Sequence, residues 1–300
     1  MTFNSIYIIG ATASGKSELA IKLSEKLNGV IINADSMQVY SGANVITACP
    51  SDDELNQAPH KLYNVIDPSN DFNVVDWVNM ATTEAENCFN NNTTPILCGG
   101  TGFYVSNFVD GISPIPDVDK NIRNEVRKLS AAQLYESLKA EDEIMATRLK
   151  DADSQRMARA LEIVRSTGKS LSHFQNMPKQ KLQTSVKPLI VGLLPDREIV
   201  YNKINARFET MFDDGVDEVQ KLLDSNLNED SQLMRAIGIP ELIKYIRGQW
   251  DKDTAIEKAQ TASRQYAKRQ MTFIRTQLNT DIQIESVDEI EKVVEAFKKQ

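Results

Sequence analysis

The sequence predicts an α/β protein with a parallel sheet, helices on both faces and an inserted all-helical subdomain. Short apolar runs alternate with helical patterns through the first third of the chain. A glycine-bounded loop joins the first apolar run to the first helix. A further apolar run appears at residues 187–194, after a long helical stretch, and therefore needs a sheet to join.

Uninterrupted apolar runs predict the first three strands, because parallel strands are covered on both faces. These strands are expected at Ile6–Ile9, Val30–Ile32 and Pro95–Cys98. Apolar residues at helical spacing predict the intervening helices at Lys16–Leu27 and Val74–Asn90.

The strand signal stops at Pro114-Ile115-Pro116-Asp117. The pattern is helical from Lys120 to Thr167, and Gly168 is a typical helix stop. Leu189–Leu194 then predicts another buried strand, and helices are expected from Arg197 to Leu278.

We therefore expect residues 117–185 to be a helical insertion in a core made of residues 1–116 and 186–300. The alternative is an α/β domain followed by a separate helical domain, which leaves the later strand without a sheet.

Composition favours a cytoplasmic protein with no membrane partner, and we expect a monomer. No apolar run approaches the roughly 20 residues needed to cross a bilayer. Met1–Ser5 leads directly into a strand, so no targeting segment is expected. Cys49, Cys88 and Cys98 lack C-x-x-C spacing and predict neither a disulfide framework nor a zinc site.

Charge is distributed unevenly along the chain. The net charge is −8, yet residues 117–185 carry 13 basic and 10 acidic side chains. Residues 1–116 carry 4 basic and 12 acidic side chains, and residues 186–300 carry 17 and 20. The basic surplus of the middle segment suits nucleic acid, or is an ordinary solvated helical surface.

The most specific motif matches the phosphate-binding pattern G-x-x-x-x-G-K-[ST] and reads Gly10-Ala11-Thr12-Ala13-Ser14-Gly15-Lys16-Ser17. Gly10 and Gly15 permit a tight turn that points backbone N–H groups at one oxyanion, and the helix dipole adds partial positive charge. Lys16 supplies a full charge, and the Ser17 hydroxyl can ligate Mg²⁺. The loop predicts a phosphate chain without saying which one. A chance match at a strand–helix turn is the alternative.

Polar loops follow the second and third predicted strands, where the carboxyl ends of parallel strands form a ligand crevice. Asp35 can hold a metal through water or accept a proton from a nucleophile, unless it merely caps a helix. Thr101, within the segment Gly99–Tyr104, offers a hydroxyl donor. The glycines of this segment either let a ligand approach the backbone closely or are needed for a tight turn between strand and helix.

Several cations are candidates for phosphate contacts. Arg156 and Arg159 share a helical face with Gln155 beside them, while Met157 belongs to the opposite, buried stripe. These arginines suit phosphates or base edges, or pair with neighbouring acids. Arg207 is a further candidate, and the sequence does not choose between it and the C-terminal basic stripe of Arg264, Lys268 and Arg275.

Together these segments resemble the tRNA dimethylallyltransferase (tRNA isopentenyltransferase) family. The resemblance covers residues 5–278 and rests on GATASGKS, NADSMQVYSG, PHKLYNVIDP, PILCGGTGFY, DSQRMARALEIVRSTGKSLS, LLPDREIVYNKINARFETMFDDG, MRAIG and SRQYAKRQMTFIR. It implies a P-loop NTPase-like α/β core whose helical insertion grips the tRNA anticodon stem-loop. It also implies transfer of a dimethylallyl group from dimethylallyl diphosphate to the exocyclic amino group of the adenosine just 3′ of the anticodon.

The resemblance assigns roles to individual residues. Asp35 would be the general base, while Lys16, Thr101 and Arg207 would stabilise the departing diphosphate, with Mg²⁺ near Ser17. The diphosphate cradle would be the loop from Gly10 to Ser17. The implied tRNA contacts are Asp35, Ser36, Met37, Gln38, Thr101, Arg123, Gln155, Arg156, Met157, Ala158 and Arg159, with a contribution from Arg235–Pro240.

Two other functions fit part of these observations. A small-molecule or nucleoside kinase would use Asp35 as base for a hydroxyl acceptor and would require ATP. A nucleotide-gated RNA-binding protein would need no catalysis.

A hydrolytic triad is not expected, because neither His60 nor His173 occurs in a suitable pattern. Leu149–Asp153 also departs from the family pattern, since it lacks the usual histidine–proline pair.

Overall fold

The computed structural model describes residues 3–149 and 153–299, so most of the divergent segment Leu149–Asp153 lies outside the described residues. The chain forms two compact units. The core unit combines Met1–Val109 with Leu182–Gln300, and the helical unit is Asp110–Lys181.

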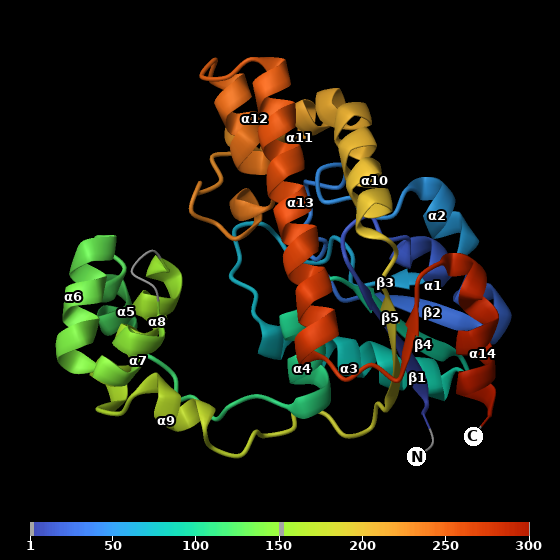
Figure 1. Ribbon diagram of the computed structural model, residues 1–300, viewed down its shortest axis with the longest axis horizontal. Helices are drawn as coiled ribbons and strands as arrows, with labels where there is room; N and C mark the ends of the chain where they lie inside the picture. The colour runs from blue at the N-terminus through green and yellow to red at the C-terminus, as the bar shows by residue number, and fades with distance from the viewer. Residues whose placement is uncertain (1–2, 150–152, 300) are drawn as a thin grey trace. The chain divides into compact units, whose positions relative to one another are not determined.

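A six-stranded sheet with the order β3-β2-β4-β1-β5-β6 forms the centre of the core unit (Figure 1). Every neighbouring pair of strands is parallel, which confirms the predicted fold class. The helical unit is an insertion, because β5 follows it in the chain and pairs with β1. The strands are β1 (Ser5–Gly10), β2 (Gly29–Asn33), β3 (His60–Lys61), β4 (Thr94–Gly99), β5 (Pro188–Leu193) and β6 (Ile282–Ile284).

Helices cover both faces of this sheet, as its central strand shows. Successive side chains of a strand point to opposite faces, so Ile6 and Ile8 enter one apolar layer, whereas Tyr7 and Ile9 enter the other. All four are fully buried, which stabilises the fold by roughly 1.5–3 kcal/mol for each isoleucine. The first layer contains α1 (Lys16–Leu27) and α14 (Ile290–Lys298), and the second contains α3 (Val74–Asn90), α4 (Gly102–Asp110) and α13 (Lys252–Gln277).

Two of the remaining helices of the core unit, α10 (Arg197–Thr210) and α12 (Ile239–Ile246), pack against α13, which also reaches β1 (Figure 1). The region predicted as helical from Arg197 to Leu278 contains several separate helices, and the fold continues beyond it into β6 and α14. These further elements are α2 (Asp52–Gln57), α10 (Arg197–Thr210), α11 (Phe212–Asp224), α12 (Ile239–Ile246) and the short 3₁₀ helices η1 (Leu233–Arg235) and η2 (Val287–Glu289).

The helical unit has an apolar core of its own, which includes Val126, Leu138 and Leu161. Its two chain ends are joined by a backbone bridge between Ile112 and Gln180. The helices are α5 (Lys120–Val126), α6 (Ala131–Glu141), α7 (Glu143–Arg148), α8 (Ser154–Thr167) and α9 (Leu171–Gln175). No helix within residues 3–149 or 153–299 is both long and apolar enough to span a membrane.

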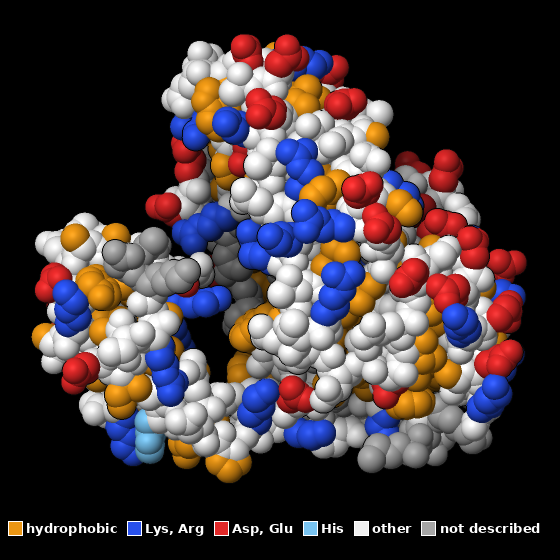
Figure 2. Space-filling model, in the orientation of Figure 1, with side chains coloured by type: hydrophobic (Ala, Val, Ile, Leu, Met, Phe, Trp, Pro, Cys, Tyr) orange, Lys and Arg blue, Asp and Glu red, His pale blue; other side chains and the backbone are white. Residues whose placement is uncertain are grey.

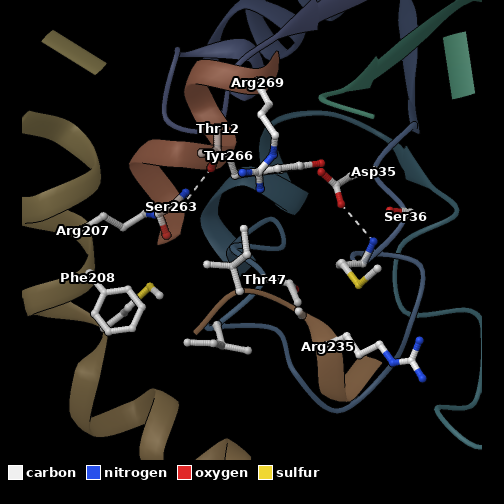
Figure 3. A pocket seen from close by; sticks show the side chains of 15 residues that line it. Thr12, Asp35, Ser36, Thr47, Arg207, Phe208, Arg235, Ser263, Tyr266 and Arg269 are labelled. Carbon is white, nitrogen blue, oxygen red and sulfur yellow. Dashed lines mark hydrogen bonds between the residues drawn. The ribbon is translucent and has the colours of Figure 1, made fainter. Parts of the chain in front are cut away.

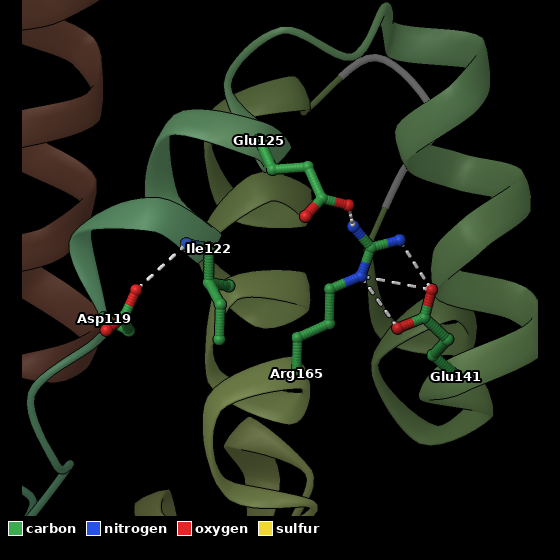
Figure 4. Close-up of polar contacts among 5 residues, drawn as sticks. All are labelled: Asp119, Ile122, Glu125, Glu141 and Arg165. Atoms are coloured by element: carbon green, nitrogen blue, oxygen red, sulfur yellow. Dashed lines mark hydrogen bonds and ion pairs between the residues drawn. The ribbon is translucent and has the colours of Figure 1, made fainter.

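A charged network ties three of these helices together (Figure 4). Arg165 on α8 donates from Nη2 to Glu141 Oε1 of α6 at 2.7 Å and from Nε to Glu141 Oε2 at 2.9 Å. Its Nη1 donates to Glu125 Oε1 of α5 at 3.1 Å. Asp119 caps α5 by accepting a hydrogen bond from the Ile122 amide.

Candidate active site

The loop from Gly10 to Ser17 connects β1 to α1 in a strained, compact turn. Gly15 has φ +99° and Ala13 has φ +61°, so both are left-handed. This conformation is natural for glycine and unfavourable for alanine, and such strain concentrates at functional sites. Ala11 and Ser14 are buried, and Ser14 Oγ has no hydrogen-bond partner among the described residues. The first turn of α1 leaves its amide groups without intrahelical partners, as an anion cradle requires.

Lys16 belongs to the first turn of α1 and folds back over this loop. Its Nζ donates a hydrogen bond to the Ala11 carbonyl at 2.7 Å. Burial lowers the pKa of Lys16, and the nearby Cys98 and Asp35 oppose that shift. The ammonium group is therefore held inside the loop, where a phosphate chain would be bound.

Asp35 lies on the loop after β2 and closes a turn. Its Oδ1 accepts a hydrogen bond from the Met37 amide at 2.9 Å, while Asn33 Oδ1 accepts one from the Asp35 amide at 2.8 Å. No helix begins here, since α2 starts only at Asp52. The helix-cap alternative for Asp35 is therefore wrong.

Thr101 joins the loop after β4 to the loop after β2. Its Oγ1 accepts a hydrogen bond from the Ser36 amide at 3.2 Å. The two loops touch so closely that a Cβ added to Gly99 would lie 2.1 Å from the Ala34 carbonyl oxygen. A glycine is therefore required at this position by the neighbouring loop itself.

A cavity of about 290 Å³ opens beside these loops (Figure 3). Arg207 on α10 reaches the P-loop, where its Nη2 donates to Thr12 Oγ1 at 3.1 Å. Burial lowers the pKa of Arg207, and the charge of Asp35 opposes that shift. The lining residues are Thr12, Asp35, Ser36, Met37, Ile46, Thr47, Arg207, Phe208, Met211, Arg235, Ala236, Ile237, Ser263, Tyr266 and Arg269. The structure thus brings Thr12, Asp35 and Arg207 together around the cavity, whereas Lys16 and Thr101 are not among the residues that line it.

A turn at residues 43–48 supplies one wall of the cavity through Ile46 and Thr47. Glu218 on α11 accepts hydrogen bonds from the Val45 and Ile46 amides at 2.9 and 3.0 Å. Gln38 donates to the carbonyls of Thr47 and Ala48 at 2.9 and 2.7 Å. The Gln38 side-chain amide therefore holds this wall, and sequence reasoning gave no indication of Glu218.

Known proteins match the chain over nearly its full length. A family model described as IPP transferase matches residues 38–277, and one described as isopentenyl transferase matches residues 4–65. The tRNA dimethylallyltransferase of Zymomonas mobilis is 41% identical over 273 residues, which are 91% of this chain and 88% of that protein. The chain belongs to the tRNA dimethylallyltransferase (IPP transferase) family.

Solved structures of similar proteins agree with this family. The tRNA delta(2)-isopentenylpyrophosphate transferase of Staphylococcus epidermidis has a TM-score of 0.70 and 31% identity, with 100% of both chains covered. A eukaryotic dimethylallyltransferase acting on tRNA has a TM-score of 0.73 and 27% identity, covering 91% of this chain and 70% of that chain.

The family's C-terminal motif SRQYAKRQMTFIR lies on α13, and the residues of it that line the cavity are not those of the basic stripe. Ser263, Tyr266 and Arg269 line the cavity. Arg264 is instead bonded to Asn205 Oδ1 of α10 at 2.6 Å, so it fastens two helices. Sequence reasoning missed Tyr266 and Arg269, although their spacing of three residues places them on one helical face.

The remaining predicted contacts lie in the helical unit. On α8, Arg156 pairs with Asp153 at 3.4 Å, and Arg159 pairs with Glu162 at 3.4 Å. The Arg156 side chain is 76% exposed despite its partner, whereas Met157 is fully buried in the core of the unit. Met157 was expected among the tRNA contacts, but its buried side chain stabilises the unit instead. Gln155 and Ala158 flank it on α8, and Arg123 lies on α5 with a buried Nε that has no partner among the described residues.

Proposed function

We propose that this chain transfers a dimethylallyl group from dimethylallyl diphosphate to the exocyclic amino group of the adenosine just 3′ of the anticodon in tRNA, releasing diphosphate. Family membership supports this function, since its relatives are named tRNA dimethylallyltransferases. The geometric observation that carries it is one cavity lined by the Asp35 carboxylate and by the Thr12–Arg207 pair at the P-loop. A base for the acceptor and cations for the leaving group therefore face the same space.

The main electrostatic task of the site is to stabilise the negative charge of the departing diphosphate. The bond between the allylic carbon and the diphosphate oxygen breaks with both electrons passing to oxygen, so charge develops on the leaving group. The loop amides, Lys16 and Arg207 are fixed beforehand around the site where this charge appears. Such prearranged donors stabilise a transition state more than flexible water does.

The adenine amino group is a poor nucleophile, because its lone pair is delocalised into the ring. As its nitrogen bonds to the allylic carbon, it loses a proton, which the Asp35 carboxylate accepts. General-base assistance of this kind contributes roughly 10²–10⁴-fold. The adenosine must also leave its stack to reach a pocket, which costs a few kcal/mol.

The oxygen donor that the P-loop offers, the Ser17 hydroxyl, is of the kind that Mg²⁺ prefers. Among the described residues, no cluster of three or more His, Cys, Asp or Glu side chains is arranged to hold a metal ion. The exposed Ser17 hydroxyl at the start of α1 would instead supply one ligand, with diphosphate oxygens and water completing the shell. Bound in this way, Mg²⁺ would neutralise part of the diphosphate charge.

We propose that the helical unit supplies the contacts to the anticodon stem-loop. Its exposed Arg156 and half-buried Arg159, with Gln155 beside them, suit phosphates and splayed bases of a single-stranded loop. In the core unit, Ser36, Met37, Arg235 and Tyr266 line the cavity that would receive the adenosine. A tRNA substrate makes the cytoplasm the expected location of the reaction.

The proposal is tested by incubating the protein with radiolabelled dimethylallyl diphosphate, Mg²⁺ and unmodified tRNA in the absence of ATP. We expect label in the tRNA, and nuclease digestion should locate it in the adenosine 3′ of the anticodon. A tRNA with guanosine at that position is the matched control and should remain unlabelled. Failure to label tRNA, together with ATP-dependent phosphorylation of a small molecule, would establish the kinase alternative instead.

A further inference from the structure

Gln270 of α13 joins two loops of the site through its side-chain amide. Its Oε1 accepts a hydrogen bond from the Thr12 amide of the P-loop at 2.8 Å, and its Nε2 donates to the Gly100 carbonyl at 2.8 Å. The side chain is buried, with 6% of its surface exposed. Both amide atoms of Gln270 are thus used for contacts between segments that are far apart in the sequence.

The surrounding residues are shaped to fit this bridge. A Cβ added to Gly100 would lie 2.2 Å from Gln270 Nε2, so only glycine leaves room for the bond. Phe273, three residues further along α13, packs equally closely on Gly102, where an added Cβ would lie 2.4 Å from its ring. The glycines after β4 therefore admit α13.

The bridge extends to the third loop of the site. Tyr266, one turn before Gln270, interacts with both Gln270 and Thr101, and Thr101 accepts a hydrogen bond from the Ser36 amide. Thr12, the residue that Gln270 fixes, is also the partner of Arg207. One face of α13 consequently connects the loops that follow β1, β4 and β2.

We propose that Gln270 is a positioning residue that holds the P-loop in the conformation required for diphosphate binding. Without it, the half-buried Thr12 N–H and the buried Gly100 carbonyl lose their partners, and the strained P-loop loses its support from α13. Part of the binding free energy would then be spent on ordering the loop. The inference rests on the proposed function, because the P-loop is taken to hold the diphosphate of the donor.

The test measures binding of inorganic pyrophosphate, in the presence of Mg²⁺, to the full chain by calorimetry. We expect Gln270→Ala to weaken this binding about tenfold, the loss typical of one buried hydrogen-bonding group. Affinity for tRNA should change much less, because the bridge supports the donor side of the site. Gln265→Ala is the matched control, since Gln265 is an exposed glutamine on the same helix, and it should bind pyrophosphate as the wild type does.

Two further variants keep the test decisive if Gln270→Ala folds poorly. Gln270→Glu keeps the size and the acceptor for Thr12 but loses the donor to Gly100, and it should also weaken pyrophosphate binding. Gly100→Ala disrupts the same hydrogen bond by placing a Cβ against Gln270 Nε2. The losses of pyrophosphate affinity caused by Gly100→Ala and by Gln270→Ala should therefore not add. Folded Gln270 variants with wild-type pyrophosphate affinity, or with equal losses for pyrophosphate and tRNA, would overturn the inference. A wild type that binds pyrophosphate but transfers no prenyl group would instead refute only the proposed function.

Discussion

At the scale of single residues, Lys16 makes the site sensitive to alkaline pH. Burial lowers its pKa, so its ammonium group loses a proton at a lower pH than a free lysine does. We expect kcat/KM for the donor, which reports the free enzyme, to fall as pH rises through this lowered pKa. In Lys16→Arg the fall should move to higher pH, because a guanidinium stays protonated. Identical alkaline limbs in the two enzymes would show that Lys16 does not supply this charge.

Residues that belong to a contiguous motif could be predicted from sequence, whereas residues brought in by tertiary packing could not. The P-loop and Asp35 follow predicted strands, so their meeting at one edge of the sheet follows from topology. The roles of Gln270 and Tyr266 could not be predicted, because they depend on which face of α13 packs against the site loops. The sequence pattern of that helix suggested phosphate contacts from the basic stripe that contains Arg264. In the structure, Arg264 instead donates a hydrogen bond to Asn205 of α10.

At the scale of elements, two arginines of α8 should separate stability from RNA binding. The Arg165 side chain is only 23% exposed and forms a bidentate pair with Glu141, so Arg165→Ala should lower the free energy of unfolding by about 1–2 kcal/mol. Arg156 is 76% exposed, so Arg156→Ala should change the free energy of unfolding by less than about 0.5 kcal/mol. Urea denaturation measures both changes.

The same two variants should behave in the opposite way toward tRNA. Arg156→Ala should weaken tRNA binding and reduce the salt dependence of log K by about one, the effect of one lost phosphate contact. Folded Arg165→Ala should keep the wild-type salt dependence. If Arg156→Ala bound tRNA with unchanged affinity and unchanged salt dependence, the role proposed for this helix face would be wrong.

Long, strongly patterned elements were predictable, and short ones were not. The strands at β1, β2, β4 and β5 are apolar runs with a clear signature. β3 contains two residues and β6 three, so neither offers enough positions for a pattern to be seen. Their places in the sheet are determined by pairing with β2 and β5.

At the scale of the whole molecule, charge and architecture assign the proposed RNA contacts and the proposed chemistry to different units. Residues 117–185 carry a basic surplus in an otherwise acidic chain and lie largely in the helical unit, where we propose RNA contacts. The core unit contains the P-loop, Asp35 and the cavity between their loops. Insertion of the helical unit between β4 and β5 leaves the strands beside the P-loop intact, because β5 still pairs with β1.

The general-base role of Asp35 is measured most directly by single-turnover transfer with Asp35→Asn, at saturating donor and tRNA. This variant keeps the size of the side chain and an oxygen that can accept the Met37 hydrogen bond, but it lacks the carboxylate base. We predict a rate lowered by roughly 10²–10⁴-fold, with separately measured affinities for donor and tRNA close to those of the wild type. A transfer rate within a few-fold of the wild type would show that the Asp35 carboxylate is not the base.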